Sequence, residues 1–335
     1  MQIRILSESD CRAAVDMAAA IDIQAEAFEL LARDRSIEGL RSFAVSKEPP
    51  GAIIFNPSVL TQGAGFGVKV VCDFYGNDDR GVPRMNALVA LFDGETGQPR
   101  TVMEAGYLTD LRTGAGTGLA ARYLARPDSK TVAIIGAGRV ARNQIEALVE
   151  VCPIEKIWLS TRSEARARDF LERMAKIGGK VPSNILVVES REAAVREADI
   201  VIAATTAKQP TFPGEALKAG TFIAAAGAYE ATSREVDSET IRRASKWVID
   251  SRTDCLDEAG DLQIPISEGI ISRDQVAQIA ELVAGERPGR EAADEITYYK
   301  SIGVPIQDLV TAQHIERRAV DLGLGTVIDI GGDND

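Results

Sequence analysis

A glycine-rich turn carries the clearest chemical signal in this sequence. In TVAIIGAGRVARNQIEAL an apolar run is followed at once by the pattern Gly-x-Gly-x-x-Ala. Gly136 permits a tight turn, Gly138 lets the backbone approach a pyrophosphate, and Ala141 keeps the next helix close to the sheet. The N-terminus of that helix, at Arg139 and Val140, presents N–H groups to an anion. The spacing therefore predicts a dinucleotide-binding βαβ unit.

The end of the next apolar run, KIWLS, indicates which dinucleotide is bound. An acidic residue there would hold a ribose 2′-hydroxyl and repel a 2′-phosphate, but this chain has Thr161, Arg162 and Ser163. An arginine between two hydroxyls suits a 2′-phosphate. We therefore expect NADP(H) to be preferred, with NAD(H) possible. The alternative is that Arg162 and Ser163 only begin the following helix in solvent.

Three cations fall among apolar or small residues near the start of the chain. Arg41 lies in GLRSFAV, Lys69 in GVKVV and Arg112 in LTDLRTGAG. Burying a cation costs free energy unless an anion pairs with it. A substrate carboxylate is one such partner, which arginine can bind with two hydrogen bonds. Internal salt bridges are the alternative, and spacing alone does not decide between them.

Composition excludes several functional classes. The 335 residues include 38 Lys+Arg against 50 Asp+Glu, and this net charge of −12 argues against a nucleic-acid partner. The single histidine, His314, leaves no His-centred metal site, so we expect no metal. Neither a membrane-spanning run nor a secretory signal is evident, and no membrane partner is expected. Four scattered cysteines favour reduced thiols in a cytoplasmic protein.

Two parts of the chain, with different patterns of expected helices and strands, must position these residues. The first part, to about residue 110, predicts one amphipathic helix over residues 10–32 followed by short strands. The strand-like runs are residues 51–55, 65–74, 87–93 and 100–105. The turn GETGQP between the last two predicts a hairpin, and the whole part is typical of an α+β fold with antiparallel pairing.

From residue 108 onward, helices and buried-looking strands alternate. Helical patterns cover residues 140–151 and 164–177, and a further helix is expected near residues 274–284. Six near-continuous apolar runs fall at residues 131–135, 156–160, 185–188, 199–205, 222–227 and 246–250. This pattern predicts a doubly wound, Rossmann-type parallel sheet, an α/β fold. A last helix in YYKSIGVPIQDLVTAQHIERRAVDLGLG is expected to return to the first domain, which would make that domain discontinuous.

Five motifs together resemble the ornithine cyclodeaminase/mu-crystallin family. They are RTGAGTGLAARYLA leading into VAIIGAGRVARNQ, then GVKVVCDFYGN, AGDLQIPISEG and DEITYYKSIGVPIQDL. The resemblance covers nearly the whole chain. It implies a substrate-binding and dimerisation domain at residues 1–112 and 305–335, an inserted NAD(P)-binding domain at residues 113–304, and a homodimer. Members pass hydride to or from an α-imino or α-amino acid.

The resemblance also assigns residues to roles. It implies that Arg41, Lys69 and Arg112 bind a substrate carboxylate. The expected cofactor contacts beyond the glycine turn are Thr113, Thr205, Thr206, Gly227, Ser301 and Gly303. Where ornithine cyclodeaminases have Gly-Gly-Asp-Cys-Pro-Gly-Lys, this chain has GAYEATS, which puts Tyr229 in place of the Asp. That departure favours the ketimine-reductase side of the family, although Glu230 keeps a cyclodeaminase open.

The leading hypothesis is NADPH-dependent reduction of a C=N bond next to a carboxylate, which yields an amino acid. Arg41 and Arg112 would fix the substrate, and Lys69 would either contact the carboxylate or relay a proton. Asp308 is a second candidate for the proton relay, or else a helix cap. Tyr229 would hydrogen-bond the substrate or only pack. The alternatives are an alanine-dehydrogenase-like enzyme, an ornithine cyclodeaminase, and a non-catalytic NADP-binding protein.

Overall fold

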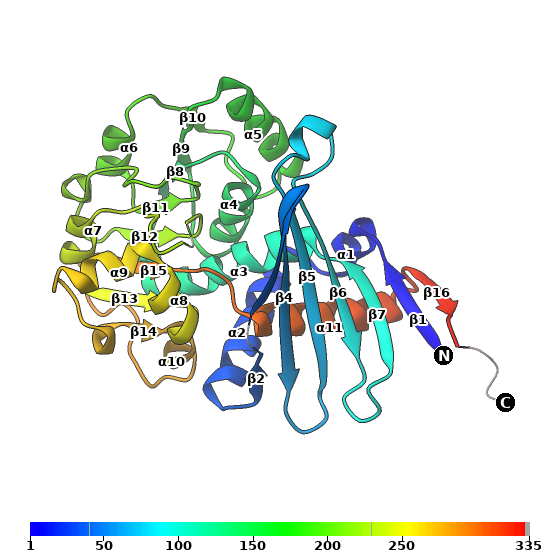
Figure 1. Cartoon of the computed structure of the whole chain (residues 1–335). Coiled ribbons are helices and arrows are strands. Elements are labelled where there is room, and N and C mark those ends of the chain that lie inside the picture. The colour runs from blue at the N-terminus through cyan, green and yellow to red at the C-terminus, as the bar shows by residue number, and fades with distance from the viewer. Residues whose placement is uncertain (40, 229, 332–335) are drawn as a thin grey trace. The chain divides into compact units, whose positions relative to one another are not determined.

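The computed structural model describes residues 1–39, 41–228 and 230–331, which fall into two compact units. Unit 1 joins Met1–Arg112 with Val304–Asp335, and unit 2 is the continuous stretch Thr113–Gly303. Each unit has its own sheet, as Figure 1 shows. No helix among the described residues combines the length and the apolar character needed to cross a membrane.

Unit 1 is built on a mixed sheet of eight strands within the described residues. Its strands are β1 (Gln2–Leu6), β2 (Ser36–Glu38), β3 (Ser42–Lys47), β4 (Pro50–Leu60), β5 (Gly65–Phe74), β6 (Met85–Phe92), β7 (Pro99–Glu104) and β16 (Thr326–Asp329). The order is β16-β1-β7-β6-β5-β4-β2, and β3 pairs with β4. All pairs are antiparallel except β1 with β7. The expected hairpin forms between β6 and β7, where the Asp93 carboxylate accepts hydrogen bonds from Thr96 N and Oγ1.

Two long helices of unit 1, α2 (Met17–Ala32) and α11 (Pro305–Asp321), pack against each other on one face of this sheet. Buried amides join them, because Gln24 Nε2 donates to Thr311 Oγ1 over 2.9 Å and Gln307 Nε2 donates to Gln24 Oε1 over 3.0 Å. Gly67 of β5 lets α11 come close, since a Cβ there would lie 3.1 Å from Leu309 Cδ1. Helix α11 is thereby fixed over the middle of the sheet.

The single helix expected over residues 10–32 is two helices. Helix α1 (Glu8–Ala14) ends before Val15, which is extended with φ −140° and ψ 126°. Asp16 then caps α2 by accepting a hydrogen bond from Ala19 N over 2.8 Å. The apolar spacing runs through the break, so periodicity hid it, and the capping preference of Asp16 was the signal that could have revealed it.

Unit 2 contains the parallel sheet that the sequence predicts, which confirms the fold class. Its strands are β8 (Thr131–Ile135), β9 (Lys156–Ser160), β10 (Ile185–Val187), β11 (Ile200–Ala203), β12 (Phe222–Ala225), β13 (Lys246–Ile249), β14 (Ala277–Gln278) and β15 (Thr297–Lys300). They run in the order β10-β9-β8-β11-β12-β15-β13-β14, and every pair is parallel. Because β8 neighbours both β9 and β11, the strand order reverses there, which is where such sheets bind ligands.

The connections are mostly helical. They are α3 (Gly106–Leu124, which contains the boundary between the units), α4 (Arg139–Val151), α5 (Glu164–Ile177), α6 (Arg191–Glu197), α7 (Ser238–Arg243), α8 (Arg252–Glu258), α9 (Gly260–Ser267) and α10 (Ile279–Val283), with 3₁₀ turns η1 (Asp78–Arg80), η2 (Gly214–Ala216) and η3 (Arg273–Gln275). Two expectations were wrong. Residues 274–284 are not one helix but η3, β14 and α10, and β15 occupies part of the segment assigned to the last helix. All four residues of β15 are buried between β12 and β13, and so short an apolar run carries no periodicity.

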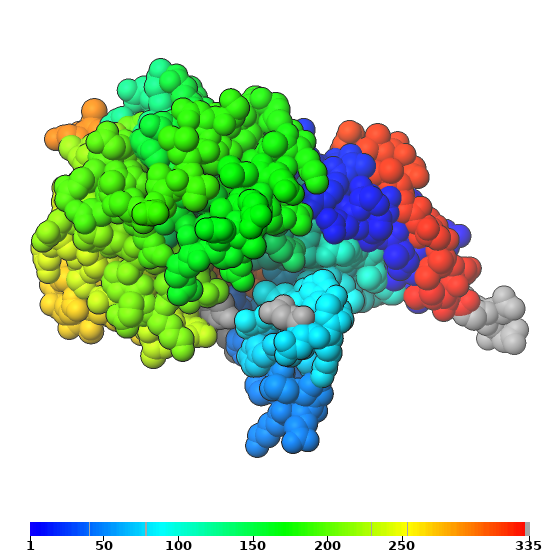
Figure 2. Space-filling model, turned by 90° about the horizontal axis from the view of Figure 1, so that it is seen from above, coloured from blue at the N-terminus to red at the C-terminus, as the bar shows by residue number. Residues whose placement is uncertain are grey.

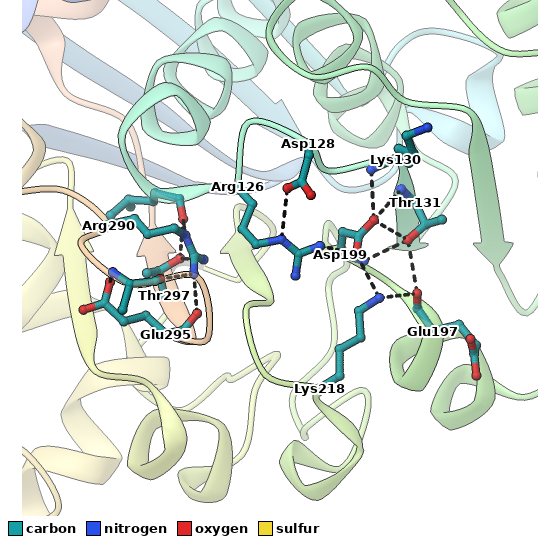
Figure 3. Close-up of polar contacts among 12 residues, drawn as sticks. Arg126, Asp128, Lys130, Thr131, Glu197, Asp199, Lys218, Arg290, Glu295 and Thr297 are labelled. Atoms are coloured by element: carbon teal, nitrogen blue, oxygen red, sulfur yellow. Dashed lines mark hydrogen bonds and ion pairs between the residues drawn. The ribbon is translucent and has the colours of Figure 1, made fainter.

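One carboxylate ties together the amino edge of the unit 2 sheet, as Figure 3 shows. Asp199 precedes β11, accepts hydrogen bonds from the backbone N–H groups of Lys130 and Thr131, and forms ion pairs with Arg126 and Lys218. Although burial raises the pKa of Asp199, the hydrogen bonds and the charge of Lys218 outweigh it and lower the pKa to about 2. This edge is therefore closed by internal contacts.

Candidate active site

Lys69, Arg112 and Asp308 form a buried cluster in unit 1. Lys69 Nζ lies 2.6 Å from Asp308 Oδ2, and Arg112 Nε lies 3.0 Å from Asp308 Oδ1. The three residues are only 4%, 7% and 4% exposed. Within the described part of the chain, Asp308 is the one acid in contact with either cation. The cluster therefore keeps one positive charge in excess, away from water.

Three elements bring these side chains together. Lys69 lies on the buried face of β5, and Asp308 lies in the first turn of α11, which covers that face. Arg112 and Thr109 project from successive turns of α3, and Lys69 Nζ donates to Thr109 Oγ1 over 3.5 Å. Val304 is the N-cap of α11, so the interpretation of Asp308 as a helix cap is wrong. The internal salt bridges considered for Lys69 and Arg112 are present, but the two cations share a single acid.

The environment changes the acidity of this pair. Burial lowers the pKa of Lys69 to about 8, because desolvation and the charges of Arg112 and Arg41 outweigh the attraction of Asp308. Burial alone would raise the pKa of Asp308, but the neighbouring Lys69 and Arg112 hold it below its usual range. Lys69 is thus charged near neutral pH and can lose a proton slightly above it, while Asp308 stays ionised.

Arg41 belongs to the same neighbourhood. Its Nε donates to Asn56 Oδ1 over 3.2 Å, and Asn56 lies directly opposite Lys69 in the β4–β5 pairing. The charge of Arg41 also contributes to the lowered pKa of Lys69. The structure therefore brings together Arg41, Lys69, Arg112 and Asp308, four of the residues singled out from the sequence.

Glu38 is a titratable neighbour that the sequence analysis missed. This residue of β2 accepts hydrogen bonds from Ile306 N at the start of α11, over 3.0 Å, and from Ser58 Oγ, over 3.3 Å. Burial raises the pKa of Glu38 to about 7, and the charge of Asp308 adds to the shift. The strand is only three residues long, so neither periodicity nor motif pointed to it.

The glycine turn of unit 2 has the conformation that a dinucleotide requires. Gly136 follows β8 with φ +111°, and a Cβ there would lie 2.3 Å from Ala204 O. Gly138 is the N-cap of α4 without a side-chain hydrogen bond, and a Cβ at this position would meet no atom within 4 Å. Ala141 is fully buried. The open space at Gly138 and the N–H groups of Arg139 and Val140 together fit a pyrophosphate.

The other predicted cofactor residues follow the carboxyl ends of neighbouring parallel strands. Thr161, Arg162 and Ser163 follow β9; Thr205 and Thr206 follow β11; Gly227 follows β12; and Ser301 and Gly303 follow β15. Thr113 lies in α3, where its carbonyl accepts a hydrogen bond from Gln144 Nε2 of α4 over 3.4 Å. Tyr229 lies outside the described residues. The parallel order of the strands places the segments after β9, β11, β12 and β15 along one edge of one sheet.

Arg162 borders an open hollow. A surface depression of about 350 Å³ is lined by Thr161, Arg162, Ser163, Glu164 and Arg168, together with apolar residues of α5 and β10. Ser163 is the N-cap of α5, its Oγ accepting a hydrogen bond from Arg166 N over 3.3 Å, so the solvent-facing helix start that was the alternative is also present. Two arginines at a hollow beside the second strand suit a phosphate group.

The single histidine of the chain is paired with a carboxylate. His314 lies on α11, where its Nε2 is 2.7 Å from Glu26 Oε2. Among the residues that the structure describes, no group of three or more His, Cys, Asp or Glu side chains is arranged to hold a metal ion.

Comparison with known proteins shows the family and the fold of this chain. The sequence profile of the ornithine cyclodeaminase/mu-crystallin family matches residues 1–322. A Δ1-pyrroline-2-carboxylate reductase of Bacillus cereus is 36% identical over 97% of this chain and 99% of its own. A second similar protein is the Δ1-pyrroline-2-carboxylate reductase of Thermococcus litoralis, whose structure is known in complex with NADH and L-proline. It has a TM-score of 0.90 and 39% identity, and the match covers 97% of this chain and 99% of the reductase chain. An archaeal alanine dehydrogenase dimer with bound NAD has a TM-score of 0.89 and 32% identity over 99% and 100% of the two chains.

Proposed function

Since the chain belongs to the ornithine cyclodeaminase/mu-crystallin family, we propose that it reduces the C=N bond of a cyclic imino acid to give an amino acid. It is an oxidoreductase of the kind that acts on C=N and CH–NH bonds. The substrate class we propose is a ring imine with a carboxylate on the imine carbon, as in Δ1-pyrroline-2-carboxylate. The observation that carries the proposal is the excess positive charge of Lys69 and Arg112 around Asp308.

The buried cations suit this substrate. A carboxylate that enters the cluster would neutralise the remaining positive charge, and an arginine beside a lysine fixes its orientation. Such positioning contributes to rate by holding the reacting groups in one geometry. We assign the carboxylate contacts to Arg41, Lys69 and Arg112.

A nicotinamide nucleotide, when bound, supplies the hydride that reduces the imine carbon. The chain must supply a proton, because an imine accepts hydride well only when its nitrogen is protonated. Lys69 is the proposed donor, since its pKa of about 8 lets it release and regain a proton near neutral pH. Asp308, which stays ionised, holds the ammonium of Lys69 by an ion pair. Glu38 is a further acid in this part of unit 1.

For the nucleotide we propose NADP(H) in preference to NAD(H). The support is the pair Arg162 and Arg168 at the hollow beside Thr161 and Ser163. Replacing Arg162 by Ala is expected to raise the KM for NADPH about tenfold or more, as the loss of a charge-assisted hydrogen bond does, and to leave the KM for NADH unchanged. Tighter binding of NADH than of NADPH by the unmodified protein would contradict this preference.

A screen of nucleotide oxidation tests the proposed reaction. Oxidation of NADPH and NADH is followed by absorbance with Δ1-pyrroline-2-carboxylate, with its six-membered homologue, and with pyruvate plus ammonium. We expect turnover of the ring imines without ammonium. Activity that requires pyruvate and ammonium would identify an alanine dehydrogenase instead, and cyclisation of L-ornithine with release of ammonia would identify a cyclodeaminase. Nucleotide binding without any turnover would favour a binding protein.

We also propose a homodimer formed through the face of the unit 1 sheet that α11 does not cover. Strand alternation puts a continuous apolar set on this face, half-buried or exposed, made up of Phe55, Pro57, Val59, Phe66, Val68, Val70, Leu88, Ala90 and Phe92. Phe66 and Phe92 stack there with ring centroids 5.1 Å apart. A twofold sheet-on-sheet contact would bury the set. In Figure 2 the medium-blue segment of β3 and β4 lies at the surface, and β4 carries part of this set.

Molar mass in solution tests this arrangement. Leu88→Asp is expected to give a monomer, whereas Ile177→Asp in α5, an equally exposed apolar position of unit 2, leaves the dimer intact. A monomeric unmodified protein would contradict the proposal.

We place the protein in the cytoplasm, where reducing conditions suit the free thiols of its four cysteines.

A further inference from the structure

A single buried carboxylate joins two of the segments at the carboxyl edge of the unit 2 sheet. Glu235 is fully buried. Its Oε1 accepts hydrogen bonds from Thr205 N over 2.6 Å and from Thr205 Oγ1 over 2.7 Å. Its Oε2 accepts from Gly227 N over 2.7 Å and from Ala228 N over 3.0 Å. One side chain thus satisfies four donors on the segments that follow β11 and β12.

Glu235 is itself held from behind. Asp261, at the start of α9, accepts hydrogen bonds through Oδ1 from Glu235 N over 2.7 Å and from Val236 N over 3.0 Å. Its Oδ2 lies 2.8 Å from Lys300 Nζ, and the same ammonium donates to the carbonyl of Ala228. The peptide groups on both sides of Ala228 are therefore tied to one buried network.

The two segments touch so closely that a side chain does not fit between them. A Cβ at Gly227 would lie 2.1 Å from Thr205 O, 2.3 Å from Thr205 N and 2.7 Å from Glu235 Oε1. Any shift of the Glu235 carboxylate must therefore move both segments. A second buried carboxylate holds the segment after β15 in a similar way. Asp250 Oδ2 accepts hydrogen bonds from Ser301 Oγ, Ile302 N and Gly303 N.

The network is buried, and it contains one cation and two carboxylates. Lys300 lies near two carboxylates, those of Asp261 and Glu235, and none of the three is more than 1% exposed. Burial raises the pKa of Glu235, and the charge of Asp261 adds to this, while Lys300 and the hydrogen bonds from Thr205 act against it. Groups held this firmly in a low-dielectric interior give a rigid frame.

We propose that Glu235 is a positioning residue, which holds the segments after β11 and β12 in the shape that binds the nicotinamide nucleotide. The inference rests on the proposed function, which places the nucleotide at this edge of the sheet. It assigns Glu235 no contact with the nucleotide and no part in the chemistry. Its effect is carried by Thr205 and Gly227.

Nucleotide affinity tests this role. In Glu235→Gln the side-chain amide keeps one acceptor but turns N–H donors toward the N–H groups of the other segment, which is then released. By fluorescence titration of the full-length protein with NADH and with NADPH, we expect both Kd values to rise about tenfold, equivalent to about 1.4 kcal/mol. Asp199→Asn at the opposite edge is the matched control, with lower thermal stability and an unchanged Kd.

An unchanged Kd in folded Glu235→Gln would overturn the inference. If that variant does not fold, Glu235→Asp replaces it, because the shorter carboxylate keeps its charge and its acceptors but cannot reach the donors of both segments at once. We expect the Kd for both nucleotides to rise about threefold in Glu235→Asp, and an unchanged Kd would again overturn the inference. A wild-type protein that binds NADH but reduces no imino acid would instead contradict the proposed function alone.

Discussion

Two buried lysines, one in each unit, have surroundings of opposite charge. Lys69 shares the carboxylate of Asp308 with a second cation, Arg112. Lys300 instead lies near two carboxylates, those of Asp261 and Glu235. Desolvation acts to lower the pKa of both lysines. At Lys69 the neighbouring cations add to this effect, and the pKa falls to about 8. At Lys300 the two carboxylates outweigh desolvation, and the pKa is raised.

We interpret the difference as one between the ligand site proposed for unit 1 and a structural frame in unit 2. A buried cluster with excess positive charge is completed by an anion from outside, while a cluster whose lysine is already surrounded by acids has no place for one. Burial and the identity of the residue are the same in both cases. The charge balance of the neighbours distinguishes them.

The largest expected effect is on catalysis, from Lys69→Met. This change removes a proposed proton donor and carboxylate contact while leaving Asp308 paired with Arg112. We expect kcat/KM for imine reduction to fall by about 10²- to 10⁴-fold, the range associated with a positioned acid or base. The Kd for NADPH and the thermal midpoint serve as controls and should change little. A variant that retains full activity would remove Lys69 from the proposed chemistry.

The matching change in unit 2, Lys300→Met, is expected to lower the free energy of unfolding. It leaves the buried carboxylates of Asp261 and Glu235 without their cation, and breaking a buried pair in this way costs about 3–5 kcal/mol. Chemical denaturation followed by circular dichroism measures the loss. If Lys300→Met were as stable as wild type, the description of this cluster as a structural frame would be wrong.

At the amino edge of the unit 2 sheet, the variant Asp199→Asn tests how much the contacts of this carboxylate stabilise the fold. The lowered pKa of Asp199, about 2 against an ordinary 3.8, corresponds to about 2 kcal/mol of stability. Because the folded-state pKa is depressed, this contribution is present above pH ~4 and is lost as the pH falls toward 2. Denaturation at pH 7 should therefore show a gap of about 2 kcal/mol between wild type and variant, which closes near pH 2. A gap that is the same at both pH values would contradict the assignment.

The smallest effect concerns the pH dependence of the wild-type enzyme. Lys69 loses its proton above pH ~8, so kcat/KM should be about tenfold lower at pH 9 than at its plateau. Lys300 stays charged over this range because its pKa is raised, and the fold should not change. In Asp308→Asn the attraction that supports the charge of Lys69 is gone, so the fall should begin at a lower pH. A flat profile up to pH 10 would contradict a role for Lys69 as the proton donor.

Local patterns in the sequence predicted the structural features that are determined by residues adjacent in the chain. The strand, the glycine turn and helix α4 were predicted because Thr131–Ile135, Gly136 and Gly138 are contiguous, and each residue type has a steric reason to be there. The parallel sheet followed from repeated apolar runs. The family resemblance then related Arg41, Lys69 and Arg112 to one another, which spacing alone could not do.

What the sequence did not reveal depends on contacts between distant segments. Glu235 and Lys300 are 65 positions apart, and each taken singly is an ordinary charged residue. The pairing of Asp308 with both Lys69 and Arg112 depends on α11 covering β5, which no local pattern states. Strand β15 was missed because four buried residues are too few to show a period. The roles assigned to individual site residues remain predictions.

The division of the chain has a consequence for the order in which the protein is made. Unit 2 is one uninterrupted stretch, and its last strand ends at Lys300, whereas unit 1 is finished only by the segment that begins at Val304. Domains fold as they leave the ribosome. Unit 2 can therefore complete its sheet first, before Asp308, the acid that pairs with Lys69 and Arg112, has been translated. A nascent chain stopped before Pro305 would contain the glycine turn but would lack Asp308, the acid that pairs with Lys69 and Arg112.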